Sequence, residues 1–291
     1  MEDCIKHIKS CRPNLSESSI KTYCNVLRNL YRDIWTEDFD YTKFIKEQPK
    51  VLKQLENVKF NVRKTILSAL VVISEKKIQQ TYRDMMVADA HQYNALQKTN
   101  KMTDAQRENW ISWKEIEEYL AKLKSKFYYI FKESKPNKEE ILNLQKYVIL
   151  ACYVLMPPRR CQDYAEMRTK SFDVNKDNFY SKGHFFFNKY KTAKFSGKQI
   201  EKLPKAFEML LSKWVKFHDN EYLFTDYYDK PLTSSGMTKI LNSIFKPRNI
   251  SVNQLRHIYI TEKSAPLMKQ LEDTAKAMGH STEQAKLYVK E

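Results

Sequence analysis

The sequence predicts a mainly helical protein in two parts, an N-terminal all-α bundle and a mixed α+β domain with one small antiparallel sheet. Three observations lead to this fold class. Apolar residues recur at helical spacing through most of the 291 residues. No strand-like alternation occurs before residue 100. Short strand-like runs separated by turn residues occur between residues 179 and 203.

The first part is expected to span residues 1–98 as a helical bundle. Its first residues, 1–14, are interpreted as a polar lead-in. The serines after Asn14 are typical of a helix cap, because their hydroxyls accept first-turn N–H groups. The helices expected after this cap have apolar residues at helical spacing and lie around residues 20–31, 44–55, 60–74 and 78–97.

The polar residues 99–109 are interpreted as a linker, and the second domain is expected to span residues 110–291. Ser112 is a candidate cap for its first helix, and Trp110 and Trp113 are expected to anchor its core. The run 142–156 is apolar on most faces, which predicts a buried helix.

Pro157 and Pro158 end that run, and a new helix is expected to start beside Arg160 and to continue through Met167. The free N–H groups of a helix start, next to arginine, form an anion-binding arrangement. The runs 185–187 and 199–203 then predict a β-hairpin or a three-stranded sheet, with a basic tip at 191–198. Later helices are expected at 204–218 and 237–245, the second after a cap at 233–235.

The amino-acid composition limits the classes of function that the protein can have. The net charge is +16 with a sequence pI of about 9.4, and both parts are basic. This indicates a polyanionic partner, nucleic acid first, and charge alone leaves a merely lysine-rich soluble protein as an equal alternative. Five cysteines without a CxxC pair favour a reducing, intracellular compartment, in the cytoplasm or nucleus of a host or in a virus. No apolar run predicts a membrane span or a signal core, and four glycines leave no Gly-rich phosphate loop.

The most informative stretch is the last forty residues. It contains Gln254-Leu255-Arg256-His257, then Met278-Gly279-His280-Ser281, then Tyr288. This order resembles the C-terminal signature of the tyrosine recombinase (phage-integrase) family, and looks most like integrases of DNA viruses and mobile elements. The resemblance covers residues 110–291 and, more loosely, residues 1–100. It implies that the helical bundle 1–98 is a DNA-binding (core-binding) domain and that residues 110–291 are the catalytic domain.

The resemblance implies a set of catalytic residues, which are Arg160, Lys191, Arg256, His280 and Tyr288. Arg160 is followed three residues later by an acid, as in the family, and Lys191 precedes a threonine on the predicted hairpin. Arg159 is the alternative to Arg160. Lys189 and Lys194 are the alternatives to Lys191. These three alternatives are also expected to contact DNA.

Three further residues are expected to support the site. Asp163 would hold an arginine or His257 in place. Asn253 occupies a position where the family usually has histidine or lysine, and an amide binds a phosphate oxygen but cannot shuttle a proton. His257 is interpreted as a hydrogen-bonding residue of the core rather than as a catalyst.

The function that the resemblance implies is site-specific cutting and rejoining of double-stranded DNA through a 3′-phosphotyrosine, without cofactor, metal or ATP. A tetramer is expected on DNA. A monomer is expected without DNA, because the three residues after Tyr288 are too few to dock on a neighbouring subunit. A helix is expected at 281–288, with Tyr288 away from Arg160 and Arg256 until DNA binds. A type IB topoisomerase and a catalytically silent DNA-binding protein are the alternatives.

Overall fold

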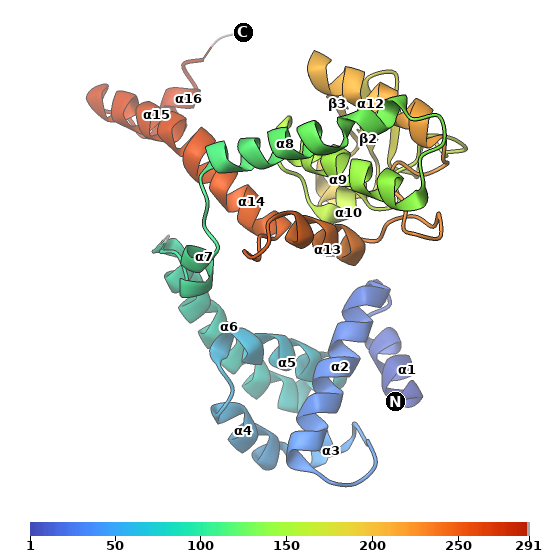
Figure 1. The fold of residues 1–291 in the computed structure, drawn as a ribbon. Coiled ribbons are helices and arrows are strands. Elements are labelled where there is room, and N and C mark those ends of the chain that lie inside the picture. Colours follow the sequence, from blue (N-terminus) through green and yellow to red (C-terminus); the bar gives the residue numbers. More distant parts are fainter. Residues whose placement is uncertain (100, 290–291) are drawn as a thin grey trace. The chain divides into compact units, whose positions relative to one another are not determined.

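The computed structural model describes residues 1–99 and 101–289, and the chain forms two compact units (Figure 1). The N-terminal unit is Met1–Met102 and the C-terminal unit is Thr103–Glu291. The division falls inside the stretch 99–109 that the sequence analysis interpreted as a linker. No helix in the described ranges is long and apolar enough to cross a membrane.

The N-terminal unit is helical throughout its described part. Its helices are α1 (Glu2–Cys11), α2 (Glu17–Ile34), α3 (Lys43–Lys46), α4 (Gln48–Glu56), α5 (Phe60–Ile73) and α6 (Lys76–Lys98). The predicted cap is Ser16, whose hydroxyl accepts from Ser19 N. Helix α5 lies at the centre, because it packs against α1, α2 and α6 and buries nearly all of its second half.

Two expectations for this unit are wrong. The predicted polar lead-in is helix α1, because Cys4 and Ile8 are one turn apart and bury a single face. The helix predicted at 44–55 is two helices. Pro49 lies in the first turn of α4, where a missing N–H is tolerated, so the chain bends before it.

The C-terminal unit is mainly helical. Its helices are α7 (Asp104–Glu108), α8 (Trp113–Phe127), the 3₁₀ helix η1 (Tyr128–Lys132), α9 (Lys138–Val154), α10 (Cys161–Tyr164), α11 (Ala193–Ser196), α12 (Lys205–His218), α13 (Ser234–Ile244), α14 (Val252–Tyr259), the π-helix η2 (Ile260–Ser264), α15 (Ala265–Ala277) and α16 (Thr282–Lys286). Ser112 and Thr233 are N-caps as predicted, and Trp113 is buried.

Helix α7 was not predicted, because its residues are polar. It forms through a reciprocal cap in which Thr103 and Gln106 satisfy each other's backbone N–H groups. The Gln254 side chain donates to Gln106 O at 3.2 Å, so α7 belongs to this unit and shortens the predicted linker.

The sheet has three antiparallel strands in the order β1 (Phe179–Ser181), β2 (His184–Phe187) and β3 (Gln199–Lys202). Alternation divides its two faces. Phe185 and Phe187 are fully buried in the core that also contains α9, whereas Phe186 stacks on Phe179 at 4.3 Å between ring centroids. The small sheet is the one expected from the sequence.

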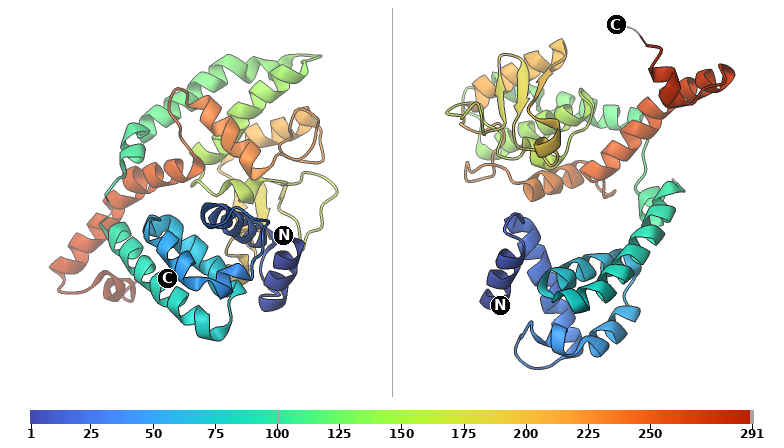
Figure 2. Two further views of the ribbon diagram at one scale, coloured as in Figure 1. Left: turned by 90° about the horizontal axis from the view of Figure 1, so that it is seen from below. Right: turned by 180° about the vertical axis from the view of Figure 1, so that it is seen from behind.

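Helices α14, η2 and α15 follow one another. We call residues 265–289, which contain α15 and α16, the C-terminal arm. Pro266 lies in the first turn of α15, and the Ala265 N–H bonds Ile260 O, five residues back. A proline lacks the N–H for a regular helical bond, so the wider π-turn accommodates it. Figures 1 and 2 show the arm extending away from the sheet.

Candidate functional site

Helix α10 carries the first predicted site residues, but it is a single turn. The predicted continuation to Met167 is wrong. Ala165 is extended and Glu166 has a φ of 58°, a left-handed value, so the chain leaves the helix there. Met167 and Arg168 then run beside β1, where Arg168 bridges to Phe179. Arg160 is the N-cap residue of the turn.

Asp163 is the centre of a charged cluster. It is 3 % exposed, and one of its carboxylate oxygens, Oδ1, has no hydrogen-bond partner in the described chain. Burial raises its pKa, and the nearby positive charges of Arg159, Arg160 and Arg256 oppose that rise. Positive charges from residues far apart in the sequence therefore act on one buried carboxylate, and we call Asp163 and these three arginines the Asp163 cluster.

Arg159 is fixed inside this cluster. Its Nε donates to Asp163 at 3.0 Å, and its Nη2 donates to Gln199 Oε1 at 2.9 Å. Its guanidinium also lies 3.9 Å from the Phe187 ring centroid, and Glu201 is 3.8 Å away. Because all of these groups occupy it, Arg159 holds the sheet to α10 and has little capacity left for a ligand.

Sequence reasoning missed Gln199 and Glu201 as partners of Arg159. The signal was present in the strand alternation. Gln199 pairs with Phe187 and Glu201 with Phe185 in the sheet register, so both lie on the core-facing side of β3. A polar side chain on that side needs a polar partner, and Arg159 is that partner.

Arg160 and Arg256 differ from Arg159, because neither side chain makes a hydrogen bond or ion pair with any residue in the described ranges. Both are partly buried. Arg256 is positioned by α14, which buries Val252, Leu255 and Ile258 on its other side. Two unoccupied guanidinium groups near one buried carboxylate form an arrangement suited to an oxyanion.

The other α14 candidates face solvent. Asn253 and His257 are both exposed. The expectation that His257 is a hydrogen-bonding core residue is wrong, because the buried face of α14 is filled by Leu255, Ile258 and Gln254. Asp163 bonds Arg159 and not His257.

The predicted lysines lie at the end of β2 and in the connection to β3. Lys191 and Lys194 are exposed and have no ion pair within the described chain, whereas Lys189 pairs with Asp177 at 3.2 Å. The connection contains the one-turn helix α11, which was not predicted. The Tyr190 hydroxyl donates to Gly197 O at 2.6 Å and closes this tip.

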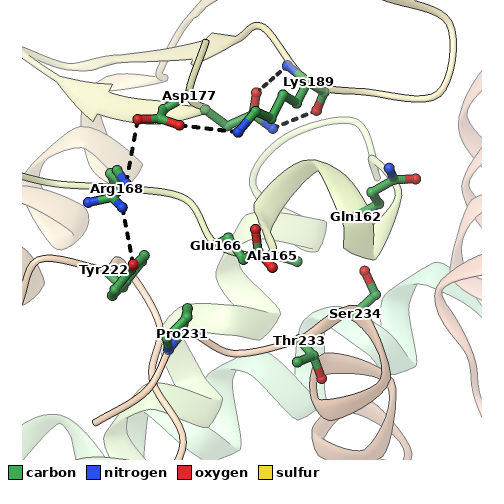
Figure 3. Close-up of a pocket in the computed structure, with 11 residues that line it drawn as sticks. Gln162, Ala165, Glu166, Arg168, Asp177, Lys189, Tyr222, Pro231, Thr233 and Ser234 are labelled. Atoms are coloured by element: carbon green, nitrogen blue, oxygen red, sulfur yellow. Dashed lines mark hydrogen bonds and ion pairs between the residues drawn. The ribbon is translucent and has the colours of Figure 1, made fainter. Parts of the chain in front are cut away.

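A cavity of about 440 Å³ opens beside α10. Figure 3 shows Gln162 from α10 near Ser234 at the start of α13, with Asp177 between Arg168 and Lys189 on the other side. Arg168 is bonded to the Tyr222 hydroxyl at 3.1 Å and to Glu221. The positive charge of Arg168 is therefore largely neutralised by Asp177 and Glu221, whereas the side chains of Arg160 and Arg256 have no acidic partner in the described ranges.

His280 and Tyr288 lie together on the C-terminal arm. Their ring centroids are 5.3 Å apart, and Tyr288 is 57 % exposed. The predicted helix at 281–288 is the shorter α16, capped by Ser281. Figures 1 and 2 show α16 apart from α10, so the structure does not bring these two residues to the Asp163 cluster.

These features define a mainly helical chain whose C-terminal unit gathers arginines around a buried carboxylate next to a small antiparallel sheet. No protein-family model matches the chain, and searches of curated proteins and of solved structures found no match. The likeness to tyrosine recombinases therefore depends on the sequence motifs alone.

Proposed function

We propose that this protein is a site-specific DNA recombinase that cuts and rejoins strands through a 3′-phosphotyrosine. The observation that carries the proposal is the Asp163 cluster. Arg160 and Arg256 come from distant parts of the chain, their charges both act on the Asp163 carboxylate, and neither guanidinium has a protein partner in the described ranges. The net charge of +16 supports a polyanionic substrate.

The two free arginines would bind the non-bridging oxygens of the scissile phosphate. Charge grows on these oxygens as a nucleophile attacks, and paired N–H donors are strongest on such an anion. Arg159 and Asp163 would hold the neighbouring backbone in place, because their mutual bond ties α10 to the sheet.

Tyr288 would supply the nucleophilic oxygen and form a bond to the 3′-phosphate, while the bond to the 5′-oxygen breaks. The imidazole of His280 lies beside the Tyr288 ring, which supports a role in orienting the phosphate or accepting the phenol proton. Lys191, exposed on the tip between β2 and β3, would protonate the leaving 5′-oxygen. Attack requires the arm to bring Tyr288 to the arginines when DNA is bound.

The test is a suicide duplex that traps the covalent intermediate. The substrate carries a nick next to the native cleavage site, so that the released strand end diffuses away and rejoining is prevented. We expect a protein–DNA adduct that resists denaturation, and its loss in Tyr288→Phe with DNA binding nearly unchanged. Tyr259→Phe is the matched control, because Tyr259 is also on the C-terminal helices but packs its ring against Trp113 at 5.0 Å. An adduct that persists in Tyr288→Phe would contradict the assignment.

The role of Lys191 has its own test. A substrate with a bridging 5′-sulfur has a leaving group that departs without a proton, so it should restore cleavage in Lys191→Ala. Rescue in Lys189→Ala or Lys194→Ala instead would move the role along the same connection.

The exposed position of Tyr288 also favours one alternative, a DNA-binding protein without catalysis. Salt-dependent binding of the duplex without any adduct from the suicide substrate would support that alternative. Relaxation of supercoiled DNA without a target site would support a type IB topoisomerase.

A further inference from the structure

The N-terminal unit contains a cavity of about 520 Å³ that has no part in the proposed DNA chemistry. It lies among α1, α3 and the turn from α5 to α6. Its apolar lining comes from the Tyr41 ring, Ile45 and Ile73. A volume of this size with apolar walls is typical of small-molecule sites.

One wall of the cavity offers hydrogen-bond donors that the protein leaves unused. Ser74 is 7 % exposed, and its hydroxyl has no partner in the described chain. Glu75 follows as the N-cap of α6 and makes no side-chain cap bond. A helix N-terminus and a free hydroxyl both suit an oxygen acceptor. The lining contains one carboxylate, Glu75, and one ammonium group, Lys46, so its formal charges balance and a neutral carbonyl compound fits it.

The cavity also contains a thiol beside an imidazole. Cys11 Sγ is 3.6 Å from His7 Nε2, and the same nitrogen is 3.1 Å from Ile73 O. A carbonyl oxygen only accepts hydrogen bonds, so Nε2 carries the proton and acts as a donor. The His7 ring is stacked on Tyr41 at 5.0 Å between centroids. The imidazole is therefore held with its N–H towards the carbonyl and the sulfur.

We propose that this cavity is a covalent binding site for a small α,β-unsaturated carbonyl compound with an aromatic or short aliphatic body. The body would lie against Tyr41, Ile45 and Ile73. The carbonyl oxygen would accept from Ser74 or from the first turn of α6. These contacts leave the β-carbon for Cys11.

The reaction is a conjugate addition. The Cys11 thiolate forms a C–S bond to the β-carbon while the C=C π bond breaks, and the electron pair moves to the carbonyl oxygen as an enolate. The α-carbon then takes a proton from water, and the proton of the thiol is released to solvent. No oxidant or second reactant is consumed, so the chemistry is complete with the thiol and the ligand.

The probe pair is N-phenylmaleimide, which is an electrophile of this class, and N-phenylsuccinimide, its saturated and unreactive analogue. The other four cysteines are buried, so the intact mass of the folded protein reports on Cys11. We expect the rate of labelling to saturate as the maleimide concentration rises, and N-phenylsuccinimide to slow it competitively. A rate that stays proportional to maleimide concentration, with no protection by the succinimide, would mean that Cys11 is only an exposed thiol and would overturn the proposal.

A variant of His7 tests whether the imidazole promotes the reaction of Cys11. His7→Phe keeps a ring against Tyr41 but removes the N–H donor, and we expect the maximal labelling rate to fall on the order of tenfold while half-saturation changes little. Lys6→Ala, on the same helix and outside the cavity lining, is the control and should label as the unchanged protein does. The competition experiment on the unchanged protein decides the question even if His7→Phe does not fold. Neither measurement involves DNA, so failure here leaves the proposed recombinase function unaffected.

Discussion

The Asp163 cluster and the C-terminal arm carry the two halves of the same proposed site, and they are built differently. The cluster is part of the core, with a carboxylate that is 3 % exposed and an arginine held by four neighbours. The arm exposes Leu267 and Met268, and no side-chain hydrogen bond or ion pair joins it to the rest of the unit in the described residues. In the proposed mechanism, the arginines that would bind the phosphate are therefore preformed in the core, whereas Tyr288, the proposed nucleophile, is on a segment without such side-chain anchors.

The largest expected effect is the loss of cleavage rate when Arg160 or Arg256, the two arginines of the cluster without a side-chain partner in the described ranges, is removed. Arg160→Ala and Arg256→Ala should each slow cleavage of the suicide duplex by a factor on the order of 10²–10³, as the loss of one transition-state donor does. Thermal unfolding should change little, because neither side chain has a protein partner in the described ranges. Single-turnover cleavage rates and melting curves test both statements. A large loss of stability in either variant would show a structural role instead.

Arg159→Ala should have the opposite profile. It leaves the Asp163 carboxylate buried without its hydrogen-bonded partner, and such a loss costs about 3–5 kcal/mol of unfolding free energy. Chemical denaturation of the isolated variant measures this value. Arg160→Ala, its neighbour in sequence, is the matched control. Equal unfolding free energies of the two variants would mean that Arg159 contributes no more to stability than Arg160 does, which would contradict the prediction.

The unfolding free energy of the C-terminal unit outside the arm should fall in acid, whereas the arm should not respond. His218 is stacked on Trp214 at 4.6 Å and hydrogen-bonded to Thr225, and burial lowers its pKa from 6.5 to about 4. The unfolded chain binds a proton below pH 6.5 that the folded chain does not bind until about pH 4. Stability is therefore complete above pH 6.5 and falls as the pH drops towards 4, by at most ~3 kcal/mol.

Denaturant midpoints across this pH window, compared with those of His218→Gln, measure that loss. The variant should have a flatter profile, because its side chain does not titrate. An identical slope in the two proteins would assign the acid sensitivity to other groups. The protection factors of amides in the arm, which are corrected for the intrinsic pH dependence of exchange, should stay unchanged over the same range.

The smallest effect is expected on the arm itself. Leu267→Ser should change the unfolding free energy by less than about 0.5 kcal/mol, since this side chain is 66 % exposed. We expect amides of α15 and α16 to exchange faster than those of α9, and the DNA-free protein to sediment as a monomer with or without the substitution. A stable DNA-free tetramer that Leu267→Ser dissociates would mean that the arm is an interface before DNA binds.

Local signals in the sequence were enough for much of the fold. Ser16, Ser112 and Thr233 were recognisable as caps because a hydroxyl before an apolar period satisfies first-turn N–H groups. The strand-like runs at Phe185–Phe187 and 199–203, with turn residues between them, indicated the sheet. Helix α7 was missed, because its cap is followed by polar residues without an apolar period.

The geometry of the candidate site was less accessible from sequence. Arg159 and Arg160 are identical neighbours, and only the β3 side chains that meet Arg159 in space distinguish them. The separation of Tyr288 from the Asp163 cluster depends on the direction of a long helical segment. Spacing in the sequence gives the order of the motifs along the chain, but it does not give that direction.

The π-helix η2 has a consequence for how this chain tolerates insertions and deletions. A π-turn is an α-helix with one added residue, and each residue of an α-helix turns its successors by about 100°. Removing one residue between Ile260 and Ser264 would therefore leave an ordinary α-turn, and α15 would keep nearly the same rotation relative to α14. The same deletion inside α14 or α15, which have no added residue, would rotate His280 and Tyr288 by about 100° relative to Arg256. The chain can thus lose one residue at η2, but not on either side of it, without changing the direction in which these two side chains point.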